Sequence, residues 1–421
     1  MSEIIKSHSE RTLDEWLYYL ESIHPSEIDM GLERIAVVAK RLAIDLSFAQ
    51  VVTVAGTNGK GTTCAFIENA LLMEQRSVAV YSSPHITEFN ERLRINQKDV
   101  ADQPLVRAFE QIEQARAEIS LTYYEYTTLA ALLVLMSVKP EFIILEVGLG
   151  GRLDATNIID ANIAVITTID LDHQAFLGNT REAIGAEKAG ILRPQQPAVI
   201  GDKQPPASVL SYGEQLSANL YCRGRQFTIE PQQDGNRWRW QSEQVIYELL
   251  PRPHIPQDNV ATALMVLKLL AIELSNQQVI TLIEQTKVAG RTEILVDGCQ
   301  VMLDVGHNPL AARYLADQVK EVSAKQVHAV VGMLSDKDIV NTIKPLIPYI
   351  DHWYLCSLDV ARGANAAQLR EVFTEQDAKN LLSFDNVSEG YKMAKAHAGK
   401  QDLILVFGSF VTVAQVKSLY N

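Results

Sequence analysis

The segment "VVTVAGTNGKGTTCAFIENALL" (51–72) joins an apolar, β-branched run to a helical pattern through a glycine-rich turn with one lysine. A turn of this kind directs successive backbone N–H groups to one point at a helix start, where proteins bind phosphate. Lys60 adds a positive charge at that point. The spacing departs from the common G-x-x-x-x-G-K-[ST] loop, because Gly56 and Gly59 are three apart and Gly61 follows the lysine. The residue types favour a phosphate site over a plain strand–turn–helix joint.

A carboxylate follows a second apolar run, in "FIILEVGLGGRLDATNII". Glu146 ends this run, and the carboxyl edge of an open α/β sheet is where such folds bind ligands. Beside a phosphate loop, an acid there suits a magnesium ion that bridges phosphate oxygens. The alternative is a half-buried glutamate paired with Arg152.

Three more positions leave two interpretations open. His173 follows the buried run of "TTIDLDH" and is either a metal ligand or a structural histidine. Ser83, in "VYSSPH", either binds a metal or phosphate or caps a turn before Pro84. Lys188 has small neighbours on a predicted helix, which favours an inward direction, although the residues alone fit a surface lysine better.

The second half of the chain offers weaker candidates. In "LDVGHNPLAA", Asp304 and His307 are placed to face a cleft, whereas Asn308 and the proline after it fit an ordinary helix cap. Asn259 and Arg291 are candidates for contacts with the adenosine or the γ-phosphate of a nucleotide.

Composition narrows the class of protein. The net charge of −13 disfavours nucleic acid and an anionic membrane surface as partners. The four cysteines are scattered without a CxxC pair, which fits a reduced cytosolic chain. The polar N-terminus lacks a signal-peptide pattern, and no apolar run nears the roughly 20 residues that span a bilayer. We expect a cytoplasmic protein.

Alternation of apolar runs and helical patterns predicts an α/β fold with a mostly parallel sheet. The larger unit, a P-loop domain, is expected at 1–290, a linker at 291–299, and a smaller Rossmann-like α/β domain at 300–421. A hairpin is expected around Asp234 and Gly235. Strands are predicted at 51–55, 77–81, 142–147, 161–169 and 198–200, with helices at 62–74, 104–119, 124–137 and 180–191.

The motifs "GTNGKGT", "SSPH", "TYYEY", "EVGLGGRLDATN", "EKAGI", "DVGHNP", "GMLSDKD" and "FGSF" occur in an order that resembles one family nearly end to end. The chain is similar to the dihydrofolate synthase/folylpolyglutamate synthases, which are Mur-ligase-like ATP-dependent amino-acid ligases. The resemblance implies that the short loop is this family's own phosphate loop. It also implies a Mur-type central domain followed by a C-terminal glutamate-ligase domain.

The resemblance assigns roles to residues of this chain. It implies catalytic roles for Lys60, Lys188, His173 and His307, with Lys188 carrying a carbamate formed from carbon dioxide and His307 on the glutamate side. The implied ATP contacts are Thr57, Asn58, Gly59, Lys60, Asn259, Arg291 and Asp304. The implied magnesium ligands, for two ions, are Ser83, Glu146 and His173. The pteridine-bearing substrate is expected against Ser22, Ile23, His24, Pro25, Thr122, Tyr123, Tyr124, Glu125, Leu153, Asp154 and Ala155.

Three positions depart from the family pattern. Gly306 and Asp258 stand where alanine and proline are expected, and Tyr124 stands where phenylalanine is common. None of these changes removes an implied ligand.

The implied activity is the ATP-dependent ligation of L-glutamate to dihydropteroate and to reduced folates through an acyl phosphate. These small molecules are the expected partners, and a monomer is expected. The alternatives are a monofunctional folylpolyglutamate synthase, a glutamate-independent P-loop kinase or NTPase, and a non-catalytic nucleotide-binding module.

Overall fold

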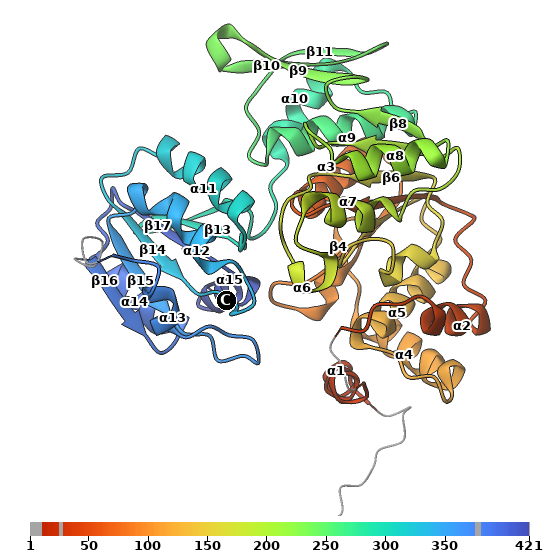
Figure 1. Cartoon of the computed structure of the whole chain (residues 1–421), viewed down its shortest axis with the longest axis horizontal. Coiled ribbons are helices and arrows are strands. Elements are labelled where there is room, and N and C mark those ends of the chain that lie inside the picture. Colours follow the sequence, from red (N-terminus) through yellow and green to blue (C-terminus); the bar gives the residue numbers. More distant parts are fainter. Residues whose placement is uncertain (1–10, 25–27, 375–379, 421) are drawn as a thin grey trace, which may run out of the picture.

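The computed structural model describes residues 11–24, 28–374 and 380–420, except for the side chain of residue 234. Its larger unit is built on an eight-stranded sheet in the order β4-β3-β2-β5-β1-β6-β7-β8 (Figure 1). Neighbouring strands are parallel except at β2–β3 and β3–β4. The strands are β1 (Gln50–Ala55), β2 (Val78–Tyr81), β3 (Leu93–Ile95), β4 (Lys98–Asp99), β5 (Phe142–Glu146), β6 (Ile163–Ile166), β7 (Pro197–Ile200) and β8 (Asn219–Cys222).

The central strands have continuous apolar sequences because both of their faces are covered. In β1, Val52 and Val54 point into one core and Val51 into the core on the opposite face. The parallel register places Val54 opposite Glu146 and Ala55 opposite Ile166. The carboxyl ends of β1, β5 and β6 therefore meet at one edge of the sheet.

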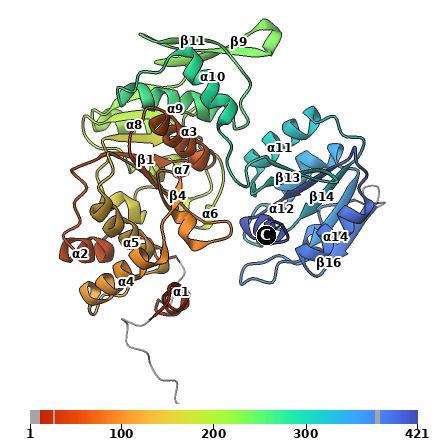
Figure 2. The ribbon, with the colours of Figure 1, turned by 180° about the vertical axis from the view of Figure 1, so that it is seen from behind.

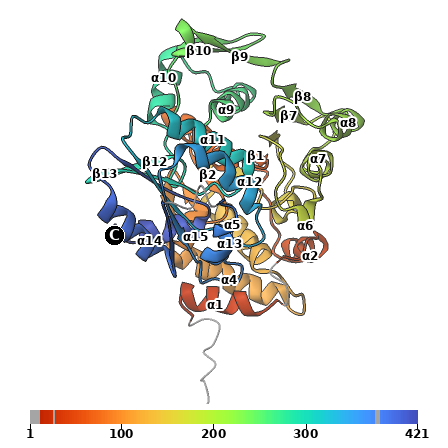
Figure 3. The same cartoon turned by 60° about the vertical axis from the view of Figure 1, so that its left-hand side comes forward.

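Helices cover both faces of this sheet (Figures 2 and 3). The helices α3, α9 and α10 share a core with one face; α1, α2, α4 and α5 lie against part of the other face, and α7 and α8 against the rest. Their bounds, with the short α6, are α1 (Leu13–Ser22), α2 (Glu33–Arg41), α3 (Lys60–Met73), α4 (Asp102–Arg116), α5 (Tyr123–Val138), α6 (Gln174–Leu177), α7 (Arg181–Ala189), α8 (Ala207–Gln215), α9 (Gln257–Leu269) and α10 (Asn276–Gln285).

The hairpin predicted around Asp234 and Gly235 is confirmed and belongs to a three-stranded antiparallel sheet. Its strands are β9 (Phe227–Gln232), β10 (Arg237–Ser242) and β11 (Ile246–Leu250). The indole of Trp240 is fully buried, and its Nε1 donates to the carbonyl oxygen of Ala261 at 3.0 Å. This contact fixes the small sheet on α9.

A six-stranded sheet forms the smaller unit, in the order β12-β13-β17-β14-β15-β16. All neighbours are parallel except β12–β13. On one face lie α11 (Pro309–Glu321), α12 (Ile339–Ile343) and α13 (Ala366–Arg370), and on the other lie α14 (Val387–His397) and α15 (Phe410–Lys417). The strands are β12 (Glu293–Asp297), β13 (Cys299–Asp304), β14 (Val327–Val331), β15 (His352–Cys356), β16 (Leu381–Phe384) and β17 (Leu403–Phe407).

Residues expected in the linker at 291–299 take part in this second sheet, which corrects that expectation. Glu293–Asp297 forms β12, the antiparallel edge strand paired with β13. Ile294 and Val296 remain exposed, so the segment lacks the buried alternation by which a strand is recognised in a sequence. The division of the chain near residue 290 stays a prediction.

The strand predicted at 161–169 ends sooner, at Ile166. Beyond it the hydroxyls of Thr167 and Thr168 donate to the carbonyl oxygen of Asn58 at 2.6 and 3.0 Å. The polar groups of this segment are thus used by the phosphate loop rather than by a neighbouring strand. Among the described residues, no helix has the length and apolar character needed to cross a membrane.

Candidate active site

The predicted phosphate loop, residues 56–61, connects β1 to the first turn of α3. Gly59 precedes the helix with a φ of 89°, in the left-handed region that glycine adopts without strain. The Asn259 side chain packs over Gly59 where a Cβ would stand. Lys60 folds back on the loop, and its Nζ donates to the carbonyl oxygen of Gly56 at 3.0 Å. These contacts hold the conformation of the loop, and Lys60 lines a pocket.

One pocket gathers most of the predicted catalytic residues. From the larger unit it is lined by the loop residues Gly56 to Gly61, Ser83, Glu146, Asp172, His173 and Lys188. From the smaller unit it is lined by Gly306, His307 and Phe410, and Arg291 joins them from the segment between the two sheets. The pocket therefore lies between the carboxyl edges of the two sheets, as α/β folds favour.

Glu146 is buried at the end of β5, with 6% of its surface exposed. The alternative partner considered above is excluded, because Arg152 pairs with Glu187, with Nη2 and Oε1 2.9 Å apart. Among the residues that the structure describes, the Glu146 carboxylate makes no hydrogen bond or ion pair. Burial raises the pKa of Glu146, although the charges of Lys60 and Arg291 oppose the change. A buried, unpaired carboxylate facing a pocket is chemically suited to a hard cation.

Lys188 is buried and lines the pocket, so the surface position that the residues alone fitted better is wrong and the inward alternative is confirmed. The loop after β5 packs on the backbone of α7: the Arg152 N–H donates to the carbonyl oxygen of Glu187 at 2.7 Å. A Cβ on Gly151 would lie 2.8 Å from that same oxygen, so glycine is needed there. Burial, with a smaller contribution from Lys60, lowers the pKa of Lys188 to about 7. A substantial fraction of this amine is therefore neutral near neutral pH.

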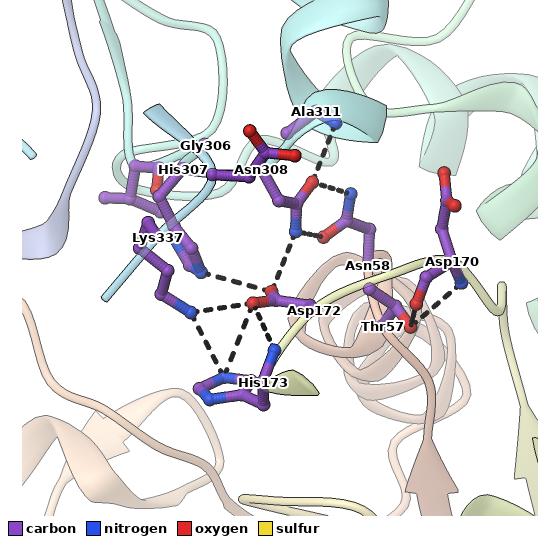
Figure 4. A network of polar contacts seen from close by, with 12 residues as sticks. Thr57, Asn58, Asp170, Asp172, His173, Gly306, His307, Asn308, Ala311 and Lys337 are labelled. Carbon is purple, nitrogen blue, oxygen red and sulfur yellow. Dashed lines mark hydrogen bonds and ion pairs between the residues drawn. The ribbon is translucent and has the colours of Figure 1, made fainter. Parts of the chain in front are cut away.

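Asp172 is the centre of a polar network that joins the two units (Figure 4). Its Oδ1 accepts from Lys337 Nζ at 2.8 Å, and its Oδ2 accepts from Asn308 Nδ2 at 3.0 Å. His307 Nε2 lies 3.5 Å from Oδ2. Although burial acts to raise it, the pKa of Asp172 is lowered by His307, His173 and Lys337. This carboxylate is thus a fixed negative charge beside the phosphate loop.

His173 adjoins the same network. Its Nε2 lies 3.3 Å from Lys337 Nζ, and its backbone N–H donates to Asp172 Oδ1 at 2.8 Å. Its φ of 50° is in the left-handed region, so the turn holds the ring against the pocket in an uncommon backbone conformation. Burial lowers the pKa of His173 to about 4, which keeps the imidazole neutral.

The amide of Asn58 faces the amide of Asn308, with two N···O distances of 2.9 Å. Asn308 also caps α11, because its Oδ1 accepts from the Ala311 N–H at 3.0 Å. The expected helix cap is therefore confirmed, and the same side chain also contacts the phosphate loop.

Three network residues were not proposed as functional from the sequence: Asp172, Asn308 and Lys337. Asp172 was passed over beside His173, although it too follows the strand end. Lys337 lies in "GMLSDKD", a motif that carried the family resemblance but was given no residue role. A lysine that reaches across two units leaves no local periodic signal.

Asn259 and Asp304 lie behind the pocket surface rather than in its lining. Asn259 Nδ2 donates to Thr62 Oγ1 at 2.8 Å and so supports the loop from α9. The buried Asp304 carboxylate accepts from the backbone N–H groups of Thr292 and Gly306 at 2.9 and 2.7 Å. A Cβ on Gly306 would stand 2.7 Å from Asp304 Oδ1 and 2.9 Å from the Ala311 Cβ, so alanine here would require these neighbours to shift. Arg291 does line the pocket, with its guanidinium 5.5 Å from the Phe410 ring centroid.

None of the described residues predicted to hold the pteridine (the wall residues) lines the pocket, although Tyr124 and Asp154 contact residues that do. Tyr124 packs on Gly148, where a Cβ would lie 2.7 Å from its Cζ, and Gly148 does line the pocket. The Tyr124 hydroxyl reaches Asp154 Oδ1 at 3.5 Å, which gives a partner to the extra oxygen relative to phenylalanine. Tyr124 also stacks on Tyr81, with ring centroids 6.4 Å apart. Stacking of Tyr123 or Tyr124 on a flat substrate ring stays a prediction.

Several of these wall residues have structural partners. Thr122 and Glu125 form a capping box at the start of α5, and Glu125 also pairs with Arg34 at 3.2 Å. Asp154 caps the turn that starts at Ala155. His24 Nε2 lies 3.6 Å from Asp29 Oδ2, and Ser22 Oγ donates to the carbonyl oxygen of Tyr19. Ile23 follows α1 directly, Leu153 is partly exposed, and Pro25 lies outside the described residues.

Comparison with known protein families agrees with this architecture. Residues 54–266 match the Mur ligase middle domain, and residues 290–410 match the glutamate ligase domain of Mur ligases. A phosphate loop on a parallel sheet that faces a second α/β sheet across a shared pocket is the arrangement of this class. The protein is an ATP-dependent ligase of the Mur type.

The most similar proteins narrow the class further. The chain is 43% identical to the Escherichia coli (strain K12) dihydrofolate synthase/folylpolyglutamate synthase, covering 97% of this chain and 96% of that protein. The structure of E. coli FolC in complex with DHPP and ADP superposes with a TM-score of 0.93 at 42% identity and 99% coverage of both chains. A bifunctional folylpolyglutamate synthase/dihydrofolate synthase with Mn, AMPPNP and L-glutamate bound gives 0.90 at 42% identity and 98% coverage of both. The chain belongs to the dihydrofolate synthase/folylpolyglutamate synthase family.

Proposed function

We propose that this protein joins L-glutamate to dihydropteroate to form dihydrofolate, and adds further glutamates to reduced folates, at the expense of ATP. The observation that carries the proposal is the shared pocket: Lys60, Glu146 and Lys188 come from the larger unit and His307 from the smaller unit. Such a pocket suits a reaction in which one substrate is activated on the larger unit and is then attacked by an amine held by the smaller unit. The similarity to bifunctional relatives over nearly the whole chain supports both activities.

The reaction requires activation because a carboxylate is a poor electrophile. Transfer of the γ-phosphoryl group of ATP to the substrate carboxylate gives an acyl phosphate. The glutamate amine attacks its carbonyl carbon, a tetrahedral intermediate forms, and inorganic phosphate leaves as the amide bond is completed. In such transfers the protein mainly positions the reactants and neutralises charge.

The phosphates of ATP would be held by the backbone of Thr57 to Gly59 and by the Lys60 ammonium. In the present arrangement Lys60 is bonded to the Gly56 carbonyl, so it exchanges one oxygen acceptor for another when phosphate binds. Arg291 and His307 both line the pocket. Arg291, in the segment between the two sheets, would meet the negative charge of ATP, and His307 of the smaller unit would meet glutamate. Asn259 and Asp304 would act by holding the loops that contact ATP.

The residues present fit a divalent cation, because Glu146 offers a buried carboxylate without a protein partner. Ser83, Glu146 and His173 would hold the cation, and other ligands would come from phosphate oxygens and water. Among the described residues there is no cluster of three His, Cys, Asp or Glu side chains suited to a metal. This is consistent with a site completed by the nucleotide. When bound, the cation supplies charge neutralisation at the phosphoryl group; two ions remain the expected number.

Lys188 would carry a carbamate. Its neutral amine attacks carbon dioxide, a nitrogen–carbon bond forms, and the amine loses a proton to leave a carbamate anion. The lowered pKa of Lys188 makes the required neutral amine available. The change replaces a cation at the pocket with an anionic oxygen ligand.

The pteridine-bearing substrate would lie against the wall formed by Tyr124, its neighbours in α5 and the loop at 153–155. We also infer a cytoplasmic location, in keeping with four buried free cysteines. The expected monomer stays a prediction.

The test is phosphate release from ATP and magnesium, with dihydropteroate and glutamate each supplied or left out. Release that requires both, with dihydrofolate formed, supports the synthase reaction. Release supported by a reduced folate but not by dihydropteroate indicates a monofunctional folylpolyglutamate synthase. Release independent of glutamate contradicts the ligase reaction and favours a kinase or NTPase.

A further inference from the structure

Lys337 brings a positive charge from the second unit to a histidine of the first. It lies in the turn between β14 and α12, and 6% of its side chain is exposed. Its Nζ donates to Asp172 Oδ1 at 2.8 Å and lies 3.3 Å from His173 Nε2 (Figure 4). This lysine therefore makes these two contacts only when the turn lies against the larger unit.

The contact with His173 decides where that ring carries its proton. An ammonium has three N–H donors and no acceptor, so its contact with Nε2 uses the lone pair of that nitrogen. A neutral imidazole has one such lone pair and carries its proton on the other nitrogen. With Lys337 seated, the His173 ring has no lone pair left for a cation.

The same conclusion holds whichever nitrogen binds the cation. If Nε2 binds it, Lys337 must give up that position. If Nδ1 binds it, Nε2 carries the proton and needs an acceptor, as metal-binding histidines normally have. Lys337 cannot accept, so two donors would face each other at 3.3 Å. The carboxylate oxygen near Nε2, Asp172 Oδ1, lies 4.0 Å away, beyond hydrogen-bond distance, and already accepts from Lys337.

We propose that Lys337 and the divalent cation compete for His173, so that the cation binds there only when Lys337 withdraws. This inference rests on the proposed role of His173 as a metal ligand. Lys337 thus acts as a tethered cation that holds the place of the metal ion. Loading of the metal ion is thereby coupled to movement of the turn between β14 and α12.

The direct test measures Mn²⁺ binding to the full chain without nucleotide or folate. The concentration of free Mn²⁺ is determined by electron paramagnetic resonance. Lys337→Met is expected to bind Mn²⁺ about tenfold more tightly, the equivalent of one polar contact to a charged group. Arg313→Gln is the matched control. It removes a cation that pairs with Asp170 across the same two units, at 2.8 Å, without touching His173. The control is expected to leave the affinity within about twofold of the original.

The His173→Ala background completes a double-mutant cycle. Under the proposal, Lys337→Met tightens Mn²⁺ binding in the original chain and has no effect once His173 is absent. Equal tightening in both backgrounds would mean that freed Asp172 binds the ion, which overturns the inference. If His173→Ala weakens Mn²⁺ binding but Lys337→Met does not tighten it, the inference fails while the proposed metal site stands. If His173→Ala leaves the affinity unchanged, the proposed metal site itself fails.

A second measurement uses the unmodified protein, since Lys337→Met also removes a buried ion pair. Amine acetylation at Lys337 is measured by mass spectrometry with and without Mg²⁺, relative to the exposed Lys344. A several-fold rise at Lys337 on adding Mg²⁺ is expected if the cation displaces it. Equal labelling in both conditions would overturn the competition.

Discussion

Arg152 is bonded to Glu187 and not to Glu146: its Nε and Nη2 lie 3.2 and 2.9 Å from Glu187 Oε1. The nearest arginine in the sequence is thus used to fasten the glycine-rich loop to α7. Glu146 is left in the pocket with no bonding partner among the described residues. A buried carboxylate in that state is costly to the fold, and the cost is consistent with a functional role.

Glu146→Gln separates the contribution of this carboxylate to activity from its cost to the stability of the fold. We expect kcat/KM for phosphate release to fall at least about 100-fold, because a neutral amide is a poor ligand for a divalent cation. The midpoint of urea unfolding without ligands is expected to stay or rise, since a buried charge is removed. A variant that loses activity and stability together would contradict this account. Glu118→Gln is the control, as it changes an exposed carboxylate that does not line the pocket.

The free energy of unfolding should depend on pH in a way that reflects the lowered pKa of Lys188. Folding lowers its pKa from 10.5 to about 7, and only 4% of the residue is exposed. Between these two values the unfolded chain binds more protons than the folded one, so the free energy of unfolding rises with pH. The slope from this residue is at most about 1.4 kcal/mol per pH unit.

Urea unfolding of the original chain and of Lys188→Met, at pH values from 7 to 9 in carbon-dioxide-free buffer, measures this slope. The difference in the free energy of unfolding between the two proteins is expected to shrink as pH rises, because the variant lacks the penalty. A difference that is constant with pH would show that Lys188 has an ordinary pKa.

The carbamate on Lys188 has its own test. With ¹³C-labelled bicarbonate, a carbamate carbon signal is expected in the original chain and not in Lys188→Ala. Removing bicarbonate should lower the rate of phosphate release, and adding it back should restore the rate. Full activity of Lys188→Ala would contradict a role for this modification.

Gly61→Ala tests why glycine follows Lys60 in the phosphate loop. Within the first turn of α3, alanine should stabilise the fold by about 0.5–1 kcal/mol, because glycine is the poorer helix former. The added methyl would lie 3.6 and 3.8 Å from the two Glu146 carboxylate oxygens, on the pocket side. We therefore expect weaker binding of an ATP analogue with Mg²⁺, measured by calorimetry, in a more stable protein. Unchanged affinity would show that the space beside Glu146 is not used.

The sequence identified the elements whose signal is local. The runs at β1 and β5 are apolar because both faces are buried, and the loop glycines stand out beside Lys60. The short strand β3 and the edge strands β4, β12 and β16 were missed, since short or half-exposed strands have little periodic pattern. The helices α1 and α2 were missed too, although α1 has a capping box at Thr12 and Glu15.

The site could be predicted only in part, for a related physical reason. Glu146, Ser83 and His173 follow strand ends, and parallel strands bring such ends together. The inward direction of Lys188 could be suspected from Ala189 and Gly190 beside it, although the residues alone fitted a surface lysine better. In contrast, the pairing of Lys337 with Asp172 joins residues of different sheets, and its partners are fixed only by how the two units pack. The difference between Asn259 behind the loop and Arg291 in the pocket likewise depends on packing.

The inclusion of β12 in the second sheet has a mechanical consequence. Because Glu293–Asp297 is hydrogen-bonded to β13, any swing of the smaller unit must be taken up between the end of α10 at Gln285 and Glu293. Arg291 lies inside that short segment and lines the pocket. A swing that parts the two sheets therefore turns the backbone that carries this arginine. The guanidinium would leave the nucleotide phosphates in the same motion that opens the path for products to depart.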